Sequence, residues 1–383
     1  MAEPKRILFL LHLPPPVHGS SIIGKIIKES SIINNGFESS YLNLLASENV
    51  AESGKVGFRK MIGFVFTWFK VLKLILNRYP HACYFALSTT GKALYKDVLL
   101  IILLKIFNIK LIYHLHNKGI SQHQHKRVYR IFYNYIFKDA KVILLSKFLY
   151  PDIQTFVPYS KVYICPNGIK DETSKFEYSN QNRQSNGLDA AQQMTFEKIV
   201  QILFLSNLIE TKGVFILLKA CTLLMKRNIP FKCIFIGAEG DINTSRINRE
   251  ITQLGLKRQV HYLGKKYGGE KSRALLDADI FVLPTYYTKE CFPLVLLEAM
   301  SYSLPAISTF EGGIPDVIED KVTGFLVPQK DSIALADKLE LLIKNPELRR
   351  GMGIAGRKKF EHEFTIEIFE KRLEKILQEV IEK

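Results

Sequence analysis

The stretch "KIVQILFLSNLIETKGVFILLKA" (residues 198–220) joins an apolar run to an amphipathic pattern through a short polar loop. An apolar run of roughly four to eight residues is typical of a buried strand, and a longer periodic stretch after it is typical of a helix. A strand followed by a helix is the repeating unit of a parallel α/β sheet. This stretch therefore predicts that a new α/β domain starts near residue 198.

The same alternation of strand and helix patterns occurs on both sides of this point. Residues 171–197 are polar, rich in Asn, Gln and Ser, and without periodicity, which is typical of a linker. The expected strands are "RILFLLHL", "ACYFAL", "IKLIYHLH", "KVILLS" and "KVYICP" before the linker, and "KIVQILFLS", "FKCIFIG", "QVHYLG", "DIFVLPT" and "LPAIST" after it. The sequence predicts two doubly wound, Rossmann-like α/β domains that face a cleft.

The predicted boundaries are a first domain over 1–170, a linker over 171–197, a second domain over 198–360 and a C-terminal helix over 361–383 that packs back toward the first domain. A length of 383 residues suffices for two domains of ordinary size. The apolar run near the N-terminus is too short for a signal peptide and lacks a cleavage site. No stretch approaches the roughly 20 apolar residues of a membrane span.

Cysteine usage and charge limit the possible classes of protein. The five scattered cysteines form no CxxC motif, which predicts buried free thiols in a reducing compartment. Residues 1–170 carry 23 Lys and Arg against 8 Asp and Glu, whereas residues 171–383 carry 30 against 29. The first domain should therefore prefer an anionic partner. No helix-turn-helix or aromatic-interleaved motif indicates a nucleic acid.

Ligands of doubly wound sheets bind beyond the carboxyl ends of the strands, near helix N-termini. In the first domain, Gly19 and Ser20 open a helix after the first strand, so their N–H groups can meet an anion or a hydroxyl. His116 ends the strand "IKLIYHLH" and is a candidate hydrogen-bonding group. Four histidines between 114 and 125 suggest a metal, but no cysteine or acid accompanies them, so no metal site is predicted.

In the second domain, Lys212 stands at the start of the helix that follows the strand of residues 198–206, where a cation and the helix dipole suit a phosphate. Gly237 ends the next strand in a glycine-bearing loop. Asp277 and Asp279 form a D-x-D string of the kind that binds metal–nucleotide complexes. They precede the strand "IFVLPT", at the wrong end for a ligand, so a helix-to-strand turn is expected instead.

Two acids surround the start of the helix in "KECFPLVLLEAM" (residues 289–300). Glu290 lies just beyond a strand, and Glu298 lies about one turn into the following helix, on the face of Leu294. The backbone N–H groups around residues Phe292, Pro293, Leu294 and Val295 are expected to point into the cleft, which suits a diphosphate. A carboxylate at Glu298 can accept two ribose hydroxyls, and Glu290 can reach the sugar beyond the phosphates.

These residues resemble the retaining GT-B glycosyltransferases, specifically glycosyltransferase family 4. The motifs that carry the resemblance are the E-x7-E pair, "KG" at 212–213, "PNGI" at 166–169, "EGGIPDVI", "KVTGFLV" and "PPPVHG", all in matching order over nearly the whole chain. The resemblance implies the GT-B fold, with acceptor binding in the first domain and nucleotide-sugar binding in the second.

The resemblance also implies roles for single residues. Lys212 should bind the donor diphosphate, Glu298 the ribose and Glu290 the transferred sugar. His116 should line the acceptor side near the reacting carbon, and Gly19 should lie near the diphosphate. No cofactor and no metal are implied, since a lysine and a helix N-terminus can neutralise the leaving diphosphate.

Two positions depart from the family pattern. Ser206 and Asn207 stand where the family commonly has Gly-Arg, so Asn207 supplies hydrogen bonds without charge to the donor phosphates. Cys291 replaces the usual small residue after the first glutamate. The uncharged Asn207 lowers the expected stabilisation of the leaving group.

The stretch "RKMIGFVFTWFKVLKLILNR" (residues 59–78) allows two interpretations. Its polar residues form one narrow stripe that contains Lys70 and Lys73, with Trp68 and several Phe residues opposite. Core packing against the first sheet explains the stretch without a function, and this interpretation is preferred here. As a basic amphipathic helix it would instead rest on an anionic bilayer.

The sequence thus predicts a glycosyltransferase that moves a sugar from a UDP- or GDP-linked donor to a lipid-linked or glycan acceptor in bacterial surface polysaccharide biosynthesis. It should be cytoplasmic and peripheral on the inner face of the plasma membrane, with an anionic membrane surface as partner. One alternative is a GT-B epimerase, for which the acid-poor first domain is unsuited. The other is a non-catalytic nucleotide-sugar-binding partner of another transferase.

Overall fold

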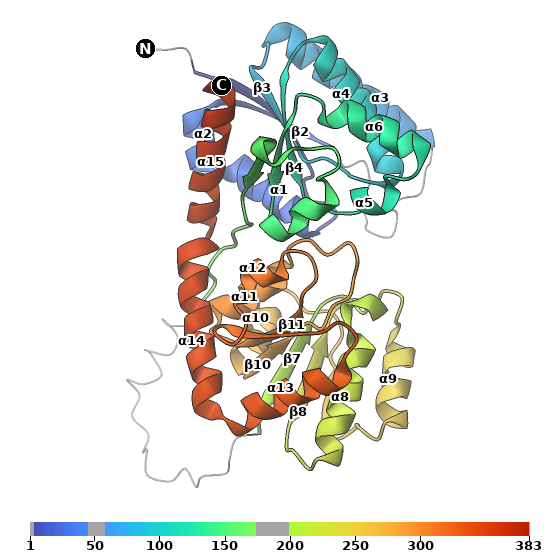
Figure 1. Ribbon diagram of the computed structural model, residues 1–383, viewed down its shortest axis with the longest axis vertical. Coiled ribbons are helices and arrows are strands. Elements are labelled where there is room, and N and C mark those ends of the chain that lie inside the picture. The colour runs from blue at the N-terminus through green and yellow to red at the C-terminus, as the bar shows by residue number, and fades with distance from the viewer. Residues whose placement is uncertain (1–3, 45–57, 174–198, 383) are drawn as a thin grey trace. The chain divides into compact units, whose positions relative to one another are not determined.

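The computed structural model describes residues 4–44, 58–173 and 199–382, and within these ranges the chain forms two compact units. Unit 1 contains residues 1–168, 288–292 and 366–383, and unit 2 contains residues 169–287 and 293–365. Each unit is an α/β sheet with helices on both faces (Figure 1). The predicted linker at 171–197 lies almost wholly outside the described residues.

Unit 1 is built on a six-stranded sheet of order β2-β1-β3-β4-β5-β6, in which every pairing is parallel. All five predicted strands are confirmed, with each end within two residues of its prediction. The strands are β1 (Arg6–Leu11), β2 (Glu38–Asn43), β3 (Ala82–Phe85), β4 (Lys110–Leu115), β5 (Lys141–Leu144) and β6 (Val162–Ile164).

The strand β2 was not predicted from the sequence. Its residues, "ESSYLN", contain no apolar run, and none of the six is fully buried. Because β2 is an edge strand that pairs only with β1, it needs little apolar side chain to hold its place.

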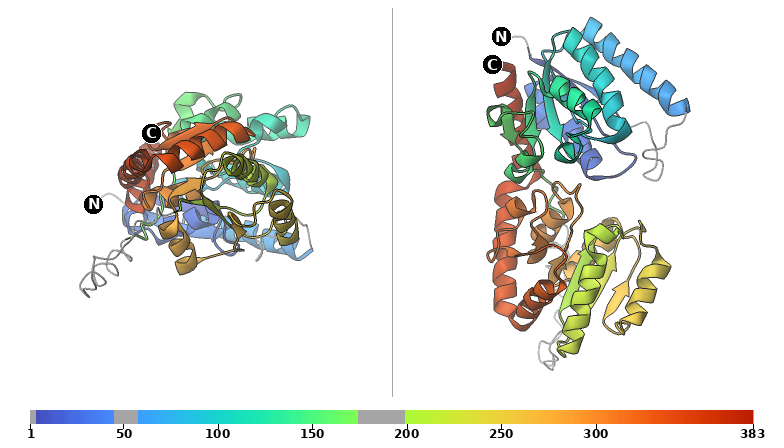
Figure 2. Two further views of the ribbon diagram at one scale, coloured as in Figure 1. Left: turned by 90° about the horizontal axis from the view of Figure 1, so that it is seen from below. Right: turned by 45° about the vertical axis from the view of Figure 1, so that its right-hand side comes forward.

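Two sets of helices cover the faces of this sheet. One face carries α1 (Gly19–Glu29), α2 (Ser31–Gly36) and α15 (Ile366–Glu382), and the other carries α3 (Phe58–Asn77), α4 (Gly91–Ile106) and α6 (Arg127–Phe137) (Figure 2). Right-handed crossovers explain this division, since the chain moves one way from β1 to β2 and the other way afterwards. The short elements are α5 (Ile120–His123), η2 (Lys147–Asp152) and η3 (Tyr159–Lys161).

The interpretation of residues 59–78 as core packing is wrong for part of α3. Phe66 and Phe69 are 64% and 57% exposed, whereas Val71 and Ile75 supply the buried contacts of the helix. Thr67 is half-buried and donates to the carbonyl of Gly63 at 2.9 Å. The outward face therefore carries aromatic side chains as well as lysines.

Unit 2 repeats this architecture with a parallel sheet of order β12-β11-β10-β7-β8-β9. The five predicted strands are again confirmed, and the edge strand β12 was not predicted. The strands are β7 (Gln201–Leu205), β8 (Lys232–Ile236), β9 (Val260–Tyr262), β10 (Ile280–Val282), β11 (Ala306–Thr309) and β12 (Gly324–Val327). The helical elements are η4 (Glu210–Lys212), α8 (Val214–Lys226), α9 (Thr244–Gln253), α10 (Gly268–Asp277), α11 (Leu294–Ser301), α12 (Ile314–Val317), α13 (Ser332–Lys344) and α14 (Pro346–Glu363).

Two predictions about individual side chains are confirmed. All five cysteines are free and buried. Asp277 ends α10, and Asp279 accepts a hydrogen bond from the N–H of Gln201 at 2.8 Å, so the D-x-D string is a helix-to-strand turn at the amino end of β10.

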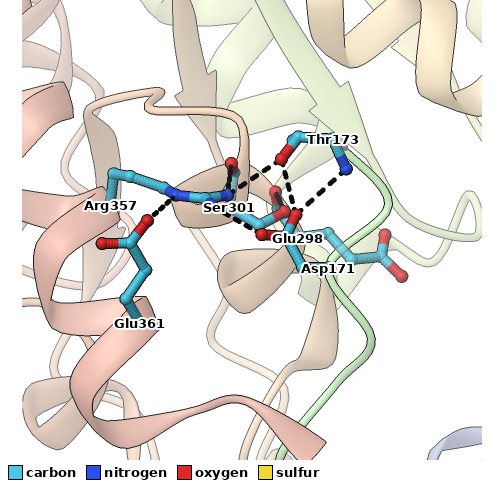
Figure 3. Close-up of polar contacts among 6 residues, drawn as sticks. All are labelled: Asp171, Thr173, Glu298, Ser301, Arg357 and Glu361. Carbon is cyan, nitrogen blue, oxygen red and sulfur yellow. Dashed lines mark hydrogen bonds and ion pairs between the residues drawn. The ribbon is translucent and has the colours of Figure 1, made fainter. Parts of the chain in front are cut away.

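Arg357 of α14 joins three segments of unit 2 (Figure 3). Its guanidinium pairs with Asp171 and Glu361 and donates to the carbonyl of Ser301, at the end of α11, at 2.6 Å. Burial raises the pKa of Asp171, but hydrogen bonds from Arg357 and Thr173 outweigh it and leave that pKa below its usual value. Close by, Ile169 pairs with Thr365, so the chain enters and leaves unit 2 through adjacent segments.

We predict that Arg357→Met lowers the free energy of unfolding of unit 2 by about 2 kcal/mol, because it leaves the half-buried Asp171 and the Ser301 carbonyl without their donor. The depressed pKa of Asp171 makes this loss largest at neutral pH and smaller as acid protonates the carboxyl group. Urea unfolding followed by circular dichroism checks both statements. Arg273→Met, which removes an exposed pair with Asp277, should change stability by less than about 0.5 kcal/mol.

A second prediction concerns Gly213, which has a left-handed φ of 90°. A Cβ there would lie 2.2 Å from the carbonyl oxygen of Pro284. Gly213→Ala should therefore destabilise unit 2 by about 2–3 kcal/mol in the same assay. Gly269→Ala in α10, where a Cβ meets nothing within 4 Å, should be neutral or slightly stabilising. Equal stability of the two variants would show that a side chain at position 213 is not strained.

Candidate functional site

The loops after β7, β8 and β10 meet at the carboxyl edge of the unit 2 sheet. A Cβ on Gly237 would lie 1.7 Å from the carbonyl oxygen of Ser206, so the β8 loop passes directly against the β7 loop. The N–H of Tyr286 donates to Thr211 at 2.7 Å and joins the β10 loop to the same place. The parallel sheet and its glycines thus bring three loops together.

The predicted residues Asn207, Lys212 and Gly237 lie in these loops. Lys212 ends the turn η4, just before α8 begins at Val214, and its Nζ lies 5.0 Å from the centre of the Tyr287 ring. A cation at this position stands in front of the N-terminal end of a 13-residue helix. Such a combination can attract a phosphate.

The helix α11 presents Glu298 on its partly exposed face. Leu294, Val295 and Glu298 are the residues of α11 that are not fully buried, which confirms that Glu298 shares a face with Leu294. Pro293 is the N-cap of the helix and makes no side-chain cap. The N-cap residue itself therefore satisfies none of the first-turn N–H groups through its side chain.

The two carboxylate oxygens of Glu298 have different surroundings. Oε1 accepts from Nζ of Lys271 in α10 at 2.8 Å, and the two side chains are 22% and 31% exposed. Oε2 is buried and accepts no hydrogen bond from the described residues. An unsatisfied buried carboxylate oxygen costs free energy, so this atom is suited to accept a hydrogen bond from a ligand.

Lys271 could not be selected from the sequence. It lies in "GGEKSRALLD", a helix with charges of both signs, and nothing in that pattern marks one lysine. Glu311, which is also buried, was missed as well. It follows β11 at the carboxyl edge and accepts from Nε2 of Gln329 at 2.7 Å. Its one sequence signal is an acid between a strand and two glycines.

The remaining predicted residues belong to unit 1. Glu290 is buried, with Phe292 beside it in the segment 288–292 that unit 1 includes. Gly19 and Ser20 open α1, and a Cβ on Gly19 would meet nothing within 4 Å. Packing inside the unit therefore does not require glycine at position 19, whereas close approach of a ligand backbone or phosphate would.

Four histidines lie close together at the carboxyl edge of the unit 1 sheet: His12, His18, His114 and His116. The ring centre of His116 lies 4.2 Å from that of His114, and the Ser20 hydroxyl bonds Nδ1 of both His12 and His18 at 3.1 Å. Burial, and then the positive charge that His114, His12 and His18 would carry, hold the pKa of His116 well below its usual value. The imidazole of His116 is therefore neutral at neutral pH and can take part in hydrogen bonds without carrying charge.

His114 points to the α1 side of the sheet and is fully buried. The neighbouring Tyr113 points the other way, donating to the carbonyl of Ile136 in α6. Tyr84 bonds Nδ1 of His114, while Nε2 has no partner among the described residues. Burial lowers the pKa of His114 to about 3, and burial followed by His18 and Lys96 lowers the pKa of His12 to about 4.

From this group, only His116 was predicted from the sequence to be a site residue. His12 and His18 flank the "PPPV" segment, and a pair of histidines around the loop after the first strand was a usable signal. His12 follows β1, His18 is the N-cap of α1 and His114 lies in β4. No group of three or more described His, Cys, Asp or Glu side chains is arranged to hold a metal ion.

Comparison with solved structures identifies the fold. A glycosyltransferase from Rickettsia africae is similar over 99% of both chains, with a TM-score of 0.74 and 16% identity. The Anabaena protein HepE in complex with UDP covers 98% of this chain and 100% of its own, with a TM-score of 0.72 and 17% identity. At this identity the likeness shows the fold, and the fold is GT-B, as predicted.

Sequence comparison finds a family model and curated relatives that match part of the chain. Residues 189–359 match the model of glycosyl transferases group 1. The putative colanic acid biosynthesis glycosyltransferase WcaL of Escherichia coli K12 is 32% identical over 185 residues, 47% of this chain and 45% of WcaL. The amylovoran biosynthesis glycosyltransferase AmsK of Erwinia amylovora is 34% identical over 183 residues, 47% of this chain and 44% of AmsK.

The predicted relation to GT-B glycosyltransferases is confirmed by these two comparisons, over residues 189–359 for the family and over both units for the fold. Each match spans less than half the length of the relative concerned. Membership of glycosyltransferase family 4 stays a prediction, as do the roles of the site residues.

The buried histidines generate a prediction about pH. Because the folded pKa of His114 is about 3 and an unfolded histidine titrates near 6.5, the unfolded chain gains its proton first as the pH falls. Stability should be complete above about pH 6.5 and decrease toward about pH 3. Between about pH 7.5 and about pH 5, His114→Phe should lose about 2 kcal/mol less unfolding free energy than the parent chain.

Urea unfolding followed by the fluorescence of Trp68 measures this difference, because Trp68 is the single tryptophan of the chain and lies in unit 1. His125→Phe is the matched control, since His125 is exposed. An unchanged pH dependence in His114→Phe would show that His114 does not resist protonation in the folded unit.

Proposed function

We propose that the protein is a retaining glycosyltransferase that moves a sugar from a nucleotide-sugar donor to a lipid-linked or glycan acceptor during the synthesis of a bacterial surface polysaccharide. The names of WcaL and AmsK, which refer to colanic acid and amylovoran, support the biosynthetic context. The UDP complex of HepE supports a nucleoside diphosphate donor, UDP-linked or GDP-linked.

The observation that carries this proposal is the carboxylate of Glu298. Lys271 occupies Oε1, and Oε2 is buried without a partner among the described residues, at the carboxyl edge of the sheet, where α/β sheets bind nucleotides. A ribose offers two neighbouring hydroxyl donors, which matches an acceptor of this kind. A carboxylate in this place serves no packing purpose on an otherwise apolar helix.

The other residues of unit 2 suit the diphosphate of the same donor. Lys212 supplies a positive charge before α8, and Asn207 supplies neutral hydrogen-bond donors from the adjacent loop. Gly237 lets the β8 loop approach that loop closely. The first turn of α11, at Leu294 and Val295, adds backbone N–H groups.

In the proposed reaction, the bond between the anomeric carbon and the diphosphate oxygen breaks, and the acceptor oxygen bonds that carbon from the same side. The acceptor proton passes to the departing phosphate oxygen, so charge and atoms balance. Lys212 and the helix N-termini stabilise the leaving diphosphate without a metal or another cofactor. Glu290 positions the transferred sugar, and the neutral His116, with Gly19 and Ser20, contacts the reacting groups from unit 1.

Location at the inner face of the plasma membrane belongs to the same proposal, because a lipid-linked acceptor lies in a bilayer. The excess of Lys and Arg in residues 1–170 supports an anionic partner for unit 1. In the described ranges, no helix has both the length and the apolar character needed to span a membrane.

A second candidate is a binding partner that holds a nucleotide sugar for another transferase. The observation that favours it is Asn207, which places an uncharged side chain where a cation would assist the leaving group. The GT-B epimerase is less suited, since an epimerase needs acids around the sugar from both units and residues 1–170 hold 8 Asp and Glu.

We predict that one nucleotide family among UDP-, GDP- and dTDP-sugars protects the chain against thermal unfolding. A donor at about 100 times its dissociation constant should add about 2.7 kcal/mol to the unfolding free energy. Lys212→Ala and Glu298→Ala should each lose this protection. Lys226→Ala, at the exposed far end of α8, is the matched control and should keep it.

Turnover separates the two candidates. An enzyme should hydrolyse the protecting donor slowly without acceptor, and Asn207→Arg should increase that rate by adding charge beside the leaving group. Protection without any hydrolysis, in the parent and in Asn207→Arg, would favour the binding partner. No protection by any donor, in a folded parent chain, would contradict the assigned nucleotide site.

A further inference from the structure

The helix α3 exposes an apolar stripe on its outer side. Val65, Phe66, Phe69 and Leu76 are between 50% and 66% exposed, while Val71 and Ile75 on the opposite side are fully buried. The exposed positions recur at the spacing of one helical face. Burying Phe66 and Phe69 would remove a large apolar area from water, so their exposure is unfavourable in the isolated unit.

The neighbouring helices α4 and α6 continue this stripe. Leu99 and Ile106 of α4 are 50% and 68% exposed, and Val128 and Ile131 of α6 are 49% and 57% exposed. All three helices lie side by side on one face of the unit 1 sheet (Figure 2). We call the outward sides of α3, α4 and α6 the outer helical face.

The outer helical face is one connected layer. The rings of Tyr95 in α4 and Phe132 in α6 meet edge to face, with their centres 5.4 Å apart. Lys105, near the end of α4, donates through Nζ to the carbonyl of Lys138 at 2.8 Å. These contacts hold α4 and α6 against each other, so their exposed apolar side chains are carried by one packed pair of helices.

The charge of this face is strongly positive. Among the described side chains of these helices, the exposed basic ones are Lys70, Lys73, Lys92, Arg127 and Arg130, whereas the sequences of the three helices contain one acid, Asp97. Asp97 is buried and accepts from the N–H of Ser88 at 2.9 Å, so it does not face outward. Lys70 and Lys73 lie among the exposed apolar side chains of α3.

The opposite face of the same sheet has neither property. Among the described residues of α1, α2 and α15, no large apolar side chain is exposed. The helix α15 alone contains five glutamates against three Lys and Arg. The combination of apolar and basic side chains is therefore particular to the outer helical face and is not a general feature of unit 1.

We propose that the outer helical face docks on an anionic phospholipid bilayer, with α3, α4 and α6 lying in the plane of the headgroups. The apolar side chains would enter the boundary between headgroups and acyl chains, and the lysines would extend to the lipid phosphates. This inference deepens the proposed membrane location and rests on it, but it does not depend on the nucleotide site of unit 2.

The charge distinguishes a bilayer from other occupants. A second copy of the chain would oppose two strongly basic surfaces, and like charges in contact are unfavourable. A nucleic acid would match the charge but would give the exposed Leu, Ile and Val side chains no apolar partner. An anionic bilayer satisfies both properties, since its surface is negative and its interior is apolar.

The test measures co-sedimentation of the full chain with vesicles of phosphatidylcholine and phosphatidylglycerol in equal amounts, and with vesicles of phosphatidylcholine alone. The parent should bind the mixed vesicles more tightly, and added salt should weaken the binding. The double variants Phe66→Ser with Phe69→Ser, and Lys70→Gln with Lys73→Gln, should each lower partitioning about tenfold or more.

Matched controls lie outside the outer helical face. Lys25→Gln with Lys28→Gln removes two exposed lysines from α1, and Val322→Ser with Ile333→Ser removes two exposed apolar side chains from unit 2. Both controls should bind vesicles within about twofold of the parent. Circular dichroism confirms that each variant is folded, which the exposure of the replaced side chains favours.

Two results would overturn the inference. One is vesicle binding that the face variants do not weaken more than the controls. The other is a concentration-dependent dimer, detected by sedimentation velocity, that dissociates in Phe66→Ser with Phe69→Ser while no vesicles are bound. Donor protection is measured on the same samples. If it persists while vesicle binding fails, the docking face is wrong and the nucleotide site is not.

Discussion

Parallel strand pairing is the constraint on which both units depend. Every pairing in the two sheets is parallel. Parallel neighbours place all their carboxyl ends at one edge, and their crossovers must cover both faces with helices. The first consequence gathers His12 and His116 in unit 1, and Lys212 and Gly237 in unit 2. The second consequence gives each sheet two helix layers, each with a solvent-facing side, and the two sides can differ in apolar and charged side chains.

The central strands could be predicted from the sequence because both of their faces are buried. A strand such as β1 or β8 must then be a continuous apolar run, which is easily distinguished from a helix. The edge strand β2 pairs on one side only and consists mostly of polar residues, so no apolar run marks it, whereas the edge strands β6 and β9 are apolar enough to be predicted. The edge strand β12 is apolar but only four residues long, and it was missed. The direction of α3 was misjudged for a related reason, since periodicity gives the width of a stripe but not which side meets the sheet.

Site residues could be predicted where their location within a single helix or strand was enough to place the side chain. Glu298 shares the face of Leu294 because helix periodicity fixes it, and Lys212 precedes a helix that the sequence already indicated. Lys271 and His12 were not found, because each acquires its meaning from a residue far away in the chain. Such contacts follow from strand order, and strand order is a property of the whole sheet that single motifs do not contain.

The position of α15 has a consequence for biosynthesis. Unit 1 begins near the N-terminus, yet it includes Ile366–Glu382, whose Phe369, Leu373 and Leu377 are fully buried in it. The ribosome makes this helix only after all of unit 2. Domains made first usually fold first, but here the first-made sheet must wait, with the surface that α15 covers still exposed to water. Unit 2 can complete its own core in that interval, so the order of folding is expected to be the reverse of the order of synthesis.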